Sequence, residues 1–192
     1  MTSFSELFPS DPKIIKDITR EGEIVTLRVQ PNTDLYHSPT ISATNAPELT
    51  THVEHFQRAS VTVSGNWTLL YDQGGIVLWL GKRWIKAGVE FVNGHANISS
   101  VATVDGHSDW ALMPFEGQRV RIELARDEEG SGVWVGLIKE DGSNIALRHV
   151  TGFFDGKDTE VPSVGVYAAR PKDGDDTPLT VKFEQWELHQ SS

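Results

Sequence analysis

The sequence predicts an all-β domain, an antiparallel sandwich or barrel, and two observations support this. Short runs of alternating apolar and polar residues recur at spacings of roughly 8–12 residues, with Gly, Asp or Asn at most junctions between them. Helical periodicity is almost absent: only residues 12–20 could form a short helical turn, capped by Ser10 or Asp11. We therefore expect very little helix.

The alternating runs define the predicted strands in chain order. They lie at residues 23–29, 59–64, 75–80, 84–91, 96–104, 119–125, 133–138, 163–169 and 179–188. Turn sequences such as Pro31-Asn32, Asp105-Gly106 and Asp141-Gly142 end several of them. No internal repeat or linker divides the chain, so residues 1–192 are expected to form one β-sandwich domain. Residues 1–22 form an N-terminal extension that packs on the domain or trails from it.

Composition and charge exclude several classes of partner. The net charge of −10 over 192 residues argues against binding to nucleic acid or to an anionic membrane, because phosphate groups need clustered positive charge. The N-terminus lacks the basic and apolar regions of a secretory signal, and no apolar run approaches the ~20 residues of a membrane span. The chain has no cysteine, which fits a reducing compartment. These features predict a cytoplasmic protein.

The predicted hairpin formed by residues 75–80 and 84–91 carries the most informative pattern. Side chains alternate across a strand, so Trp84, Lys86 and Glu90 share one face. The residues between them, Ile85, Ala87, Val89 and Phe91, share the other face. The apolar face is expected to belong to the core. The face with the lysine and the carboxylate is expected to form the floor of a groove.

Three sequence blocks resemble the signature blocks of the DUF1349 family: 71–75 (Tyr-Asp-Gln-Gly-Gly), 84–90 (Trp-Ile-Lys-Ala-Gly-Val-Glu) and 108–110 (Ser-Asp-Trp). Residues 33–36 (Thr-Asp-Leu-Tyr) and 45–47 (Asn-Ala-Pro) are similar to two further blocks. The family includes the fungal "regulation of enolase" proteins. The resemblance implies a concanavalin A-like jelly roll, the lectin/glucanase sandwich of two antiparallel sheets. This chain departs from the family at Trp79, where relatives usually carry arginine, and at Leu35-Tyr36, which replaces Phe-Trp.

The resemblance also implies a ligand groove on the concave sheet. There, Lys86 would donate to ligand oxygens, Glu90 would accept from hydroxyl groups, and Gln73 would do both. An indole stacked on a sugar ring would add apolar contact. The predicted ligand-binding residues are Tyr36, Tyr71, Asp72, Gln73, Trp79, Trp84, Lys86, Glu90, Asp109 and Trp110.

Structural roles compete with these assignments. Asp72 precedes a Gly-Gly pair and could bind backbone amides, and Asp109 could form an Asx turn at the start of a strand. For any single tryptophan, packing in the core is the more frequent role. Lys86 and Glu90 could also lie on the solvent face of an edge strand.

No catalytic or metal signature is complete. Retaining glycosidases need two carboxylates about 5–5.5 Å apart, and the laminarinase-type Glu-x-Asp-x-x-Glu pattern does not occur; Glu90 with Asp72 or Asp109 is the pair left open. The groups His52, Glu54, His55 and Asp105, His107, Asp109 match no defined zinc or calcium pattern. The sequence therefore predicts no bound metal and no cofactor.

Three functions remain. The first is a non-catalytic cytoplasmic binding or regulatory protein with a groove for a carbohydrate or another small polar ligand. The second, implied by the resemblance alone, is docking on a metabolic enzyme such as enolase. The alternative is an enzyme acting on a small molecule or glycan with Lys86 and Glu90 as acid and base. Exposed edge strands leave a homodimer possible.

Overall fold

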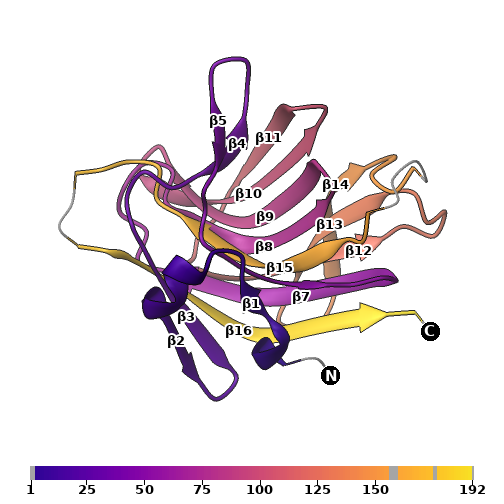
Figure 1. Ribbon diagram of the computed structural model, residues 1–192, viewed down its shortest axis with the longest axis horizontal. Helices are drawn as coiled ribbons and strands as arrows, with labels where there is room; N and C mark the ends of the chain where they lie inside the picture. The colour runs from indigo at the N-terminus through magenta and orange to yellow at the C-terminus, as the bar shows by residue number, and fades with distance from the viewer. Residues whose placement is uncertain (1–2, 156–159, 175–176, 192) are drawn as a thin grey trace.

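The computed structural model describes residues 3–155, 160–174 and 177–191, and it confirms the predicted all-β fold. Two seven-stranded sheets stack face to face, and the strand pairs within each are antiparallel (Figure 1). A two-stranded hairpin lies over sheet A. Among the described residues, no helix has the length and apolar character that crossing a membrane requires.

Sheet A carries the candidate groove residues. Its spatial order is β1 (Phe8–Pro9), β6 (Glu48–His52), β15 (Ser163–Ala169), β8 (Gln73–Leu80), β9 (Arg83–Val92), β10 (His95–Val104) and β11 (His107–Pro114). Strands β8 to β11 are consecutive in the chain, so tight turns join this part of the sheet. The hairpin predicted from the sequence is β8–β9, with Leu80 opposite Arg83 at its turn.

Sheet B covers the inner face of sheet A. Its order is β14 (Asn144–Val150), β13 (Val133–Ile138), β12 (Arg119–Arg126), β7 (Phe56–Gly65), β16 (Leu179–Gln190), β3 (Ile24–Val29) and β2 (Ile18–Glu21). The separate hairpin consists of β4 (Leu35–His37) and β5 (Ser42–Thr44).

The N-terminal residues pack on both sheets. A 3₁₀ turn, η1 (Phe4–Glu6), places Phe4 and Leu7 in the core, and β1 pairs with β6 of sheet A. The helical turn predicted at 12–20 is shorter, η2 (Pro12–Asp17), because the chain then pairs with β3 as β2. Arg20 ties the segment together by donating to the carbonyl groups of Phe4 and Leu7.

The main core lies between the sheets and follows the predicted alternation. On β9, Ile85, Ala87 and Val89 are fully buried against sheet B, as the hairpin pattern predicted. A fully buried branched side chain contributes about 1.5–3 kcal/mol through removal of its apolar surface from water, so this face dominates the stability of the sandwich.

A second, smaller cluster lies on the outer face of sheet A, which points away from sheet B. Residues 34–46, here called the covering hairpin, contain β4 and β5 and lay Leu35 and Ala46 onto this face. Their partners in the cluster are Val77, Trp84, Val101, Tyr167 and Ala169. The centre of sheet A is therefore buried on both faces.

Two glycines stand opposite each other between the polar residues of the outer face. Gly75 pairs with Gly88, two pairs away from Val77–Lys86 and two pairs away from Gln73–Glu90. A Cβ on Gly88 would lie 2.1 Å from the carbonyl oxygen of Gly74, and one on Gly75 would lie 1.9 Å from that of Ala87. Only glycine fits this pair, and the space above it is left for neighbouring side chains.

We predict that Gly88→Ala lowers the free energy of unfolding by about 3 kcal/mol, because the new methyl group forces two backbones apart. Urea unfolding followed by tryptophan fluorescence measures this. Gly136→Ala is the matched control, because the three atoms nearest to its Cβ all belong to the side chain of Asn144, which can move. Its cost is expected to stay below about 1 kcal/mol. Similar losses for both variants would contradict the close approach at Gly88.

Candidate functional site

A pocket of about 230 Å³ opens on the outer face of sheet A beside the covering hairpin. Sheet strands supply its floor, and the covering hairpin and the loop before β8 supply its sides. The lining residues are Asp34, Tyr36, Ile41, Tyr71, Gln73, Lys86, Glu90, Val101 and Trp110.

Lys86 is the buried cation of the pocket. Its side chain is only 3% exposed, and its Nζ donates to Gln73 Oε1 at 2.6 Å. The carboxylate of Asp34 lies 3.8 Å from the same nitrogen. Lys86 pairs with Val77, so it lies four strand pairs from Gln73, with the Gly75–Gly88 pair halfway between them. The missing side chains at this pair leave room for the lysine to reach Gln73.

Glu90 is the buried anion. Its Oε2 accepts from Ser99 Oγ at 2.6 Å and from Trp110 Nε1 at 3.0 Å. Both donors come from neighbouring strands, β10 and β11, so the sheet itself fixes the carboxylate. The second carboxylate oxygen stays available to a ligand hydroxyl group, because a carboxylate has about four acceptor positions.

Asp34 joins the covering hairpin to the floor. Its Oδ1 accepts from Gln73 Nε2 at 3.2 Å, while its backbone N–H donates to the side chain of Asn45 at 2.9 Å. Gln73 is thereby oriented, its amide oxygen toward Lys86 and its amide nitrogen toward Asp34. A lysine, an amide and two carboxylates thus meet in one hollow.

Aromatic side chains flank these polar groups. Tyr71 and Trp110 meet edge to face with centroids 6.1 Å apart, and Lys172 Nζ lies 5.8 Å from the centroid of Tyr71. Tyr71 has a φ of +70°, a rare left-handed conformation that turns the loop into the pocket. Trp110 is 38% exposed, so part of its ring is open to a ligand.

Burial shifts the pKa values of the charged groups in opposite directions. Burial lowers the pKa of Lys86, and the charges of Asp34, Glu90 and Glu48 oppose that shift. Burial raises the pKa of Glu90, against Lys86 and the hydrogen bonds from Ser99 and Trp110. Paired ionisable groups with displaced pKa values are typical of functional sites.

The structure brings six of the ten predicted residues together in this pocket: Tyr36, Tyr71, Gln73, Lys86, Glu90 and Trp110. Asp72 lies elsewhere, fully buried in an ion pair with Arg170, whose Nη2 is 2.7 Å from Asp72 Oδ2. Asp72 also accepts from the backbone N–H groups of Thr68 and Leu69, so it fixes the loop before β8. This is the backbone-binding alternative considered for Asp72.

Asp109 faces the opposite side of sheet A, because its neighbour Trp110 faces the pocket. It lies within β11, where it pairs with Ala102 of β10, rather than in an Asx turn, and it forms an ion pair with Arg148 of sheet B. The sequence left Asp72 and Asp109 as possible carboxylate partners of Glu90, and neither of them lines the pocket. The carboxylate that shares the pocket with Glu90 is Asp34.

Trp79 and Trp84 share the outer face with Lys86 but lie under or beside the covering hairpin. Trp84 is fully buried in the second cluster. Trp79 packs against that cluster and donates to Glu48 Oε2 at 3.0 Å. Neither lines the pocket, because the covering hairpin occupies the surface that an open groove would expose.

Sequence reasoning missed Asp34, Ser99, Val101 and Ile41. Asp34 stood within the 33–36 block, so its signal was present in the sequence. Ser99 lies in the run Ile98-Ser99-Ser100-Val101, in which two adjacent serines give no sign of which one faces the pocket. Among the described residues, no group of three or more His, Cys, Asp or Glu is arranged to hold a metal ion.

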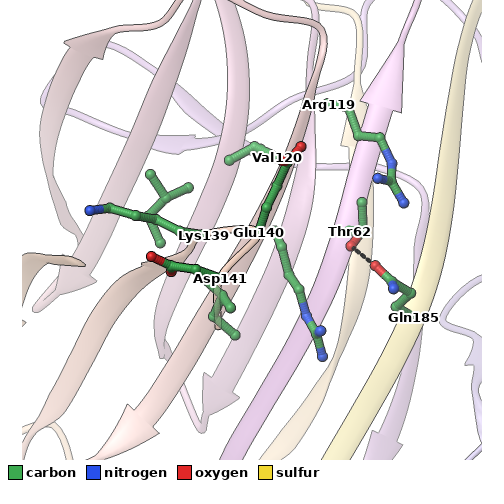
Figure 2. A pocket seen from close by; sticks show the side chains of 10 residues that line it. Thr62, Arg119, Val120, Lys139, Glu140, Asp141 and Gln185 are labelled. Carbon is green, nitrogen blue, oxygen red and sulfur yellow. Dashed lines mark hydrogen bonds between the residues drawn. The ribbon is translucent and has the colours of Figure 1, made fainter. Parts of the chain in front are cut away.

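A wider hollow, of about 770 Å³, lies on the outer face of sheet B and has a different character (Figure 2). Its arginines are already paired, Arg119 with Glu184 at 3.3 Å and Arg121 with Glu187 at 2.8 Å. Thr62 donates to Gln185 Oε1 at 2.7 Å across its floor (Figure 2). Exposed ion pairs of this kind contribute little to stability, and they leave these arginines with carboxylate partners of their own. We therefore interpret this hollow as a solvated sheet face.

We predict that Asp72→Ala lowers the free energy of unfolding by about 3–5 kcal/mol, because it leaves the buried charge of Arg170 unpaired. Asp109→Ala removes a carboxylate whose side chain is 80% exposed and should cost less than about 1 kcal/mol. Chemical denaturation of both variants tests this. Equal losses would refute a structural role specific to Asp72.

Glu48 gives a pH prediction. Burial raises its pKa from 4.5 to about 7, so its contribution to stability is present below pH 4.5 and is lost as pH rises through about 7. Glu48→Gln keeps an acceptor for Trp79 and removes this loss. The unfolding free energy of the variant relative to the wild type should therefore rise by about 3 kcal/mol between pH 4.5 and pH 8. A constant difference across that range would contradict the prediction.

Curated proteins and solved structures give the relatives of this chain. An uncharacterized protein of Emericella nidulans is 35% identical over 156 residues, covering 76% of each chain. Regulation of enolase protein 1 of Saccharomyces cerevisiae is 31% identical over 176 residues, 90% of this chain and 85% of the relative. A crystal structure of a functionally unknown protein from Saccharomyces cerevisiae superposes with a TM-score of 0.84 at 25% identity over the full length of both chains.

More distant structures share the fold alone. A GH43 protein of Bacillus licheniformis matches 89% of this chain with 34% of its own, with a TM-score of 0.68 at 14% identity. Lectin I-B4 of Griffonia simplicifolia covers 98% of this chain with 94% of its own, with a TM-score of 0.55 at 13% identity. The lectin-like sandwich implied by the sequence blocks is thereby confirmed. The model of a protein family of unknown function, DUF1349, matches residues 10–191, so this chain belongs to the DUF1349 family.

Proposed function

We propose that this protein binds one neutral, polyhydroxylated small molecule, of the carbohydrate class, in the pocket around Lys86 and Glu90. The observation that carries the proposal is the arrangement of a buried donor and a buried acceptor between aromatic side chains. Hydroxyl groups both donate and accept, so a polyol can satisfy Lys86, Glu90 and the amide of Gln73 together. Trp110 and Tyr71 offer apolar surface for the carbon face of a ring.

The charge and the volume of the pocket narrow the choice of ligand further. Among the described residues that line the pocket, Lys86 is the one cation and faces the carboxylates of Asp34 and Glu90. A sugar acid or a phosphorylated sugar would bring another negative charge beside these two carboxylates. A volume of about 230 Å³ equals that of roughly eight water molecules in the liquid, at about 30 Å³ each, and lies below the ~300–1,000 Å³ of sites for drug-sized ligands. A single sugar unit matches this space better than an oligosaccharide.

The regulatory part of the proposal rests on a relative. Regulation of enolase protein 1 is 31% identical to this chain, and its name connects it with enolase. We propose an enolase as a protein partner and the cytoplasm as the location, consistent with the absence of cysteine. A homodimer through the open edge strands stays a prediction.

Enzymatic activity is the second candidate, favoured by the opposed pKa shifts of Lys86 and Glu90. A carboxyl group with a raised pKa can act as a general acid, and an amine with a lowered pKa can act as a base. Under this reading, Glu90→Gln would bind the ligand and fail to convert it. Mass spectrometry of ligand incubated with wild-type protein and with the variant decides between binding and turnover.

We predict that Glu90→Gln and Lys86→Met weaken ligand binding by about 10- to 100-fold, since each removes a charge-assisted hydrogen bond worth about 1.5–3 kcal/mol. Isothermal titration calorimetry with neutral methyl glycosides tests this, with glucuronic acid as the charged comparison ligand. Thermal unfolding of each variant without ligand separates binding from folding. Unchanged affinity in two folded variants would refute the site.

Two tryptophans provide a matched pair for the same experiment. Trp110 is 38% exposed beside the pocket, and Trp134 is 42% exposed on sheet B, where it stacks on His149 at 4.0 Å. Trp110→Ala is expected to abolish measurable binding, because it removes both a stacking surface and a donor to Glu90. Trp134→Ala is expected to bind like the wild type. Equal effects of the two changes would show that surface hydrophobicity, rather than the pocket, governs binding.

A further inference from the structure

The covering hairpin divides the outer face of sheet A into two hollows. On one side, Tyr36 lines the pocket with Lys86 and Glu90. On the other side, His37 and Thr44 line a separate hollow of about 860 Å³, together with Trp79 and Trp84. Tyr36 and His37 are neighbours on β4, so the alternation of side chains along one strand places one residue in each hollow.

The hairpin is fixed to the sheet at several points. Leu35 is fully buried and Ala46 nearly so, both within the second cluster. The backbone N–H of His37 donates to Ser108 Oγ at 2.9 Å, and Ser108 Oγ lies 2.7 Å from Thr103 Oγ1. Figure 1 shows the β4–β5 hairpin rising beside β11 of sheet A. Removing it would expose buried apolar side chains to water, so apolar burial holds the hairpin on the sheet as a barrier between the two hollows.

The barrier interrupts the path that a polymer would follow. Lys86 belongs to the pocket and Trp84 to the other hollow, yet they are two residues apart on the same face of β9, about 7 Å at the usual rise. A linear glycan lying along this strand would have to pass through the position of Leu35. The ligand must therefore enter the pocket by its end.

We propose that the pocket recognises a single sugar unit, free or at the terminus of a chain, and excludes the interior of a polysaccharide. This rests on the carbohydrate function proposed above. It adds a specificity that the polar groups alone do not give, because Lys86, Gln73 and Glu90 would serve an internal unit equally well.

Oligosaccharides of increasing length test the proposal. Calorimetric titration of the wild-type protein would use one to six units of glucose, xylose, mannose and galactose, with cyclic glucose hexamer as a ligand without ends. For the sugar that binds, the Kd should stay within about threefold from one unit to six, and the cyclic compound should not bind. Saturation-transfer NMR should label the protons of one terminal unit.

Results that contradict end recognition differ from results that contradict carbohydrate binding. A tenfold or greater gain in affinity with chain length, or binding of the cyclic hexamer, would overturn end recognition while leaving the carbohydrate function standing. Failure of every ligand, including the single sugars, would overturn the carbohydrate function and this inference with it.

A double variant adds a second readout. Thr44→Ala/Lys82→Ala changes two exposed residues of the other hollow and none of the pocket. End recognition predicts that this variant binds the hexamer and the single sugar as the wild type does. A loss confined to the hexamer would show that the chain crosses both hollows, and it would overturn the proposal.

Discussion

The ammonium group of Lys86, held on the outer face of a sheet that is itself buried, is the constraint around which this site is built. An unpaired buried charge would cost several kcal/mol, so the surrounding residues must compensate it. Gln73 supplies a hydrogen bond, and Asp34 and Glu90 supply opposite charge. Each of these groups is in turn fixed by its own partner. The polar groups of the pocket thus form one connected network, in which each side chain is oriented by another.

The second apolar cluster holds the covering hairpin on the outer face of sheet A and so shapes the site. In a sandwich with one open face, the outer residues of sheet A would meet water. Here the covering hairpin buries Trp84 and Val77 and leaves open only the part of the face around Lys86 and Glu90. The same segment contributes Asp34 and Tyr36 to the pocket, so the covering of the sheet and the shape of the site have one origin.

The fold followed from the sequence more completely than the site did. Alternation identified β8 and β9 and assigned Lys86 and Glu90 to one face, and the sequence blocks indicated the lectin-like sandwich. Alternation gives the face of a strand but not what covers it, so Trp84 was expected in a groove and lies under residues far from it in sequence. Asp72 and Asp109 could not be placed, because their partners, Arg170 and Arg148, are distant along the chain.

The opposed glycines have a consequence for how the chain finds its pairing. A sheet buried on both faces loses much of the apolar–polar contrast that normally rejects slipped strands. In the native alignment, Gly75 meets Gly88 and Lys86 reaches Gln73 across that gap. A shift of β9 along β8 would bring side chains into contact with the neighbouring backbone. It would also separate Lys86 from its acceptor, the side chain of Gln73. The close backbone approach at Gly75 and Gly88 and the need of Lys86 for an acceptor therefore disfavour the same shifted pairings. Residues in and beside the pocket thus also keep β9 in register with β8 during folding.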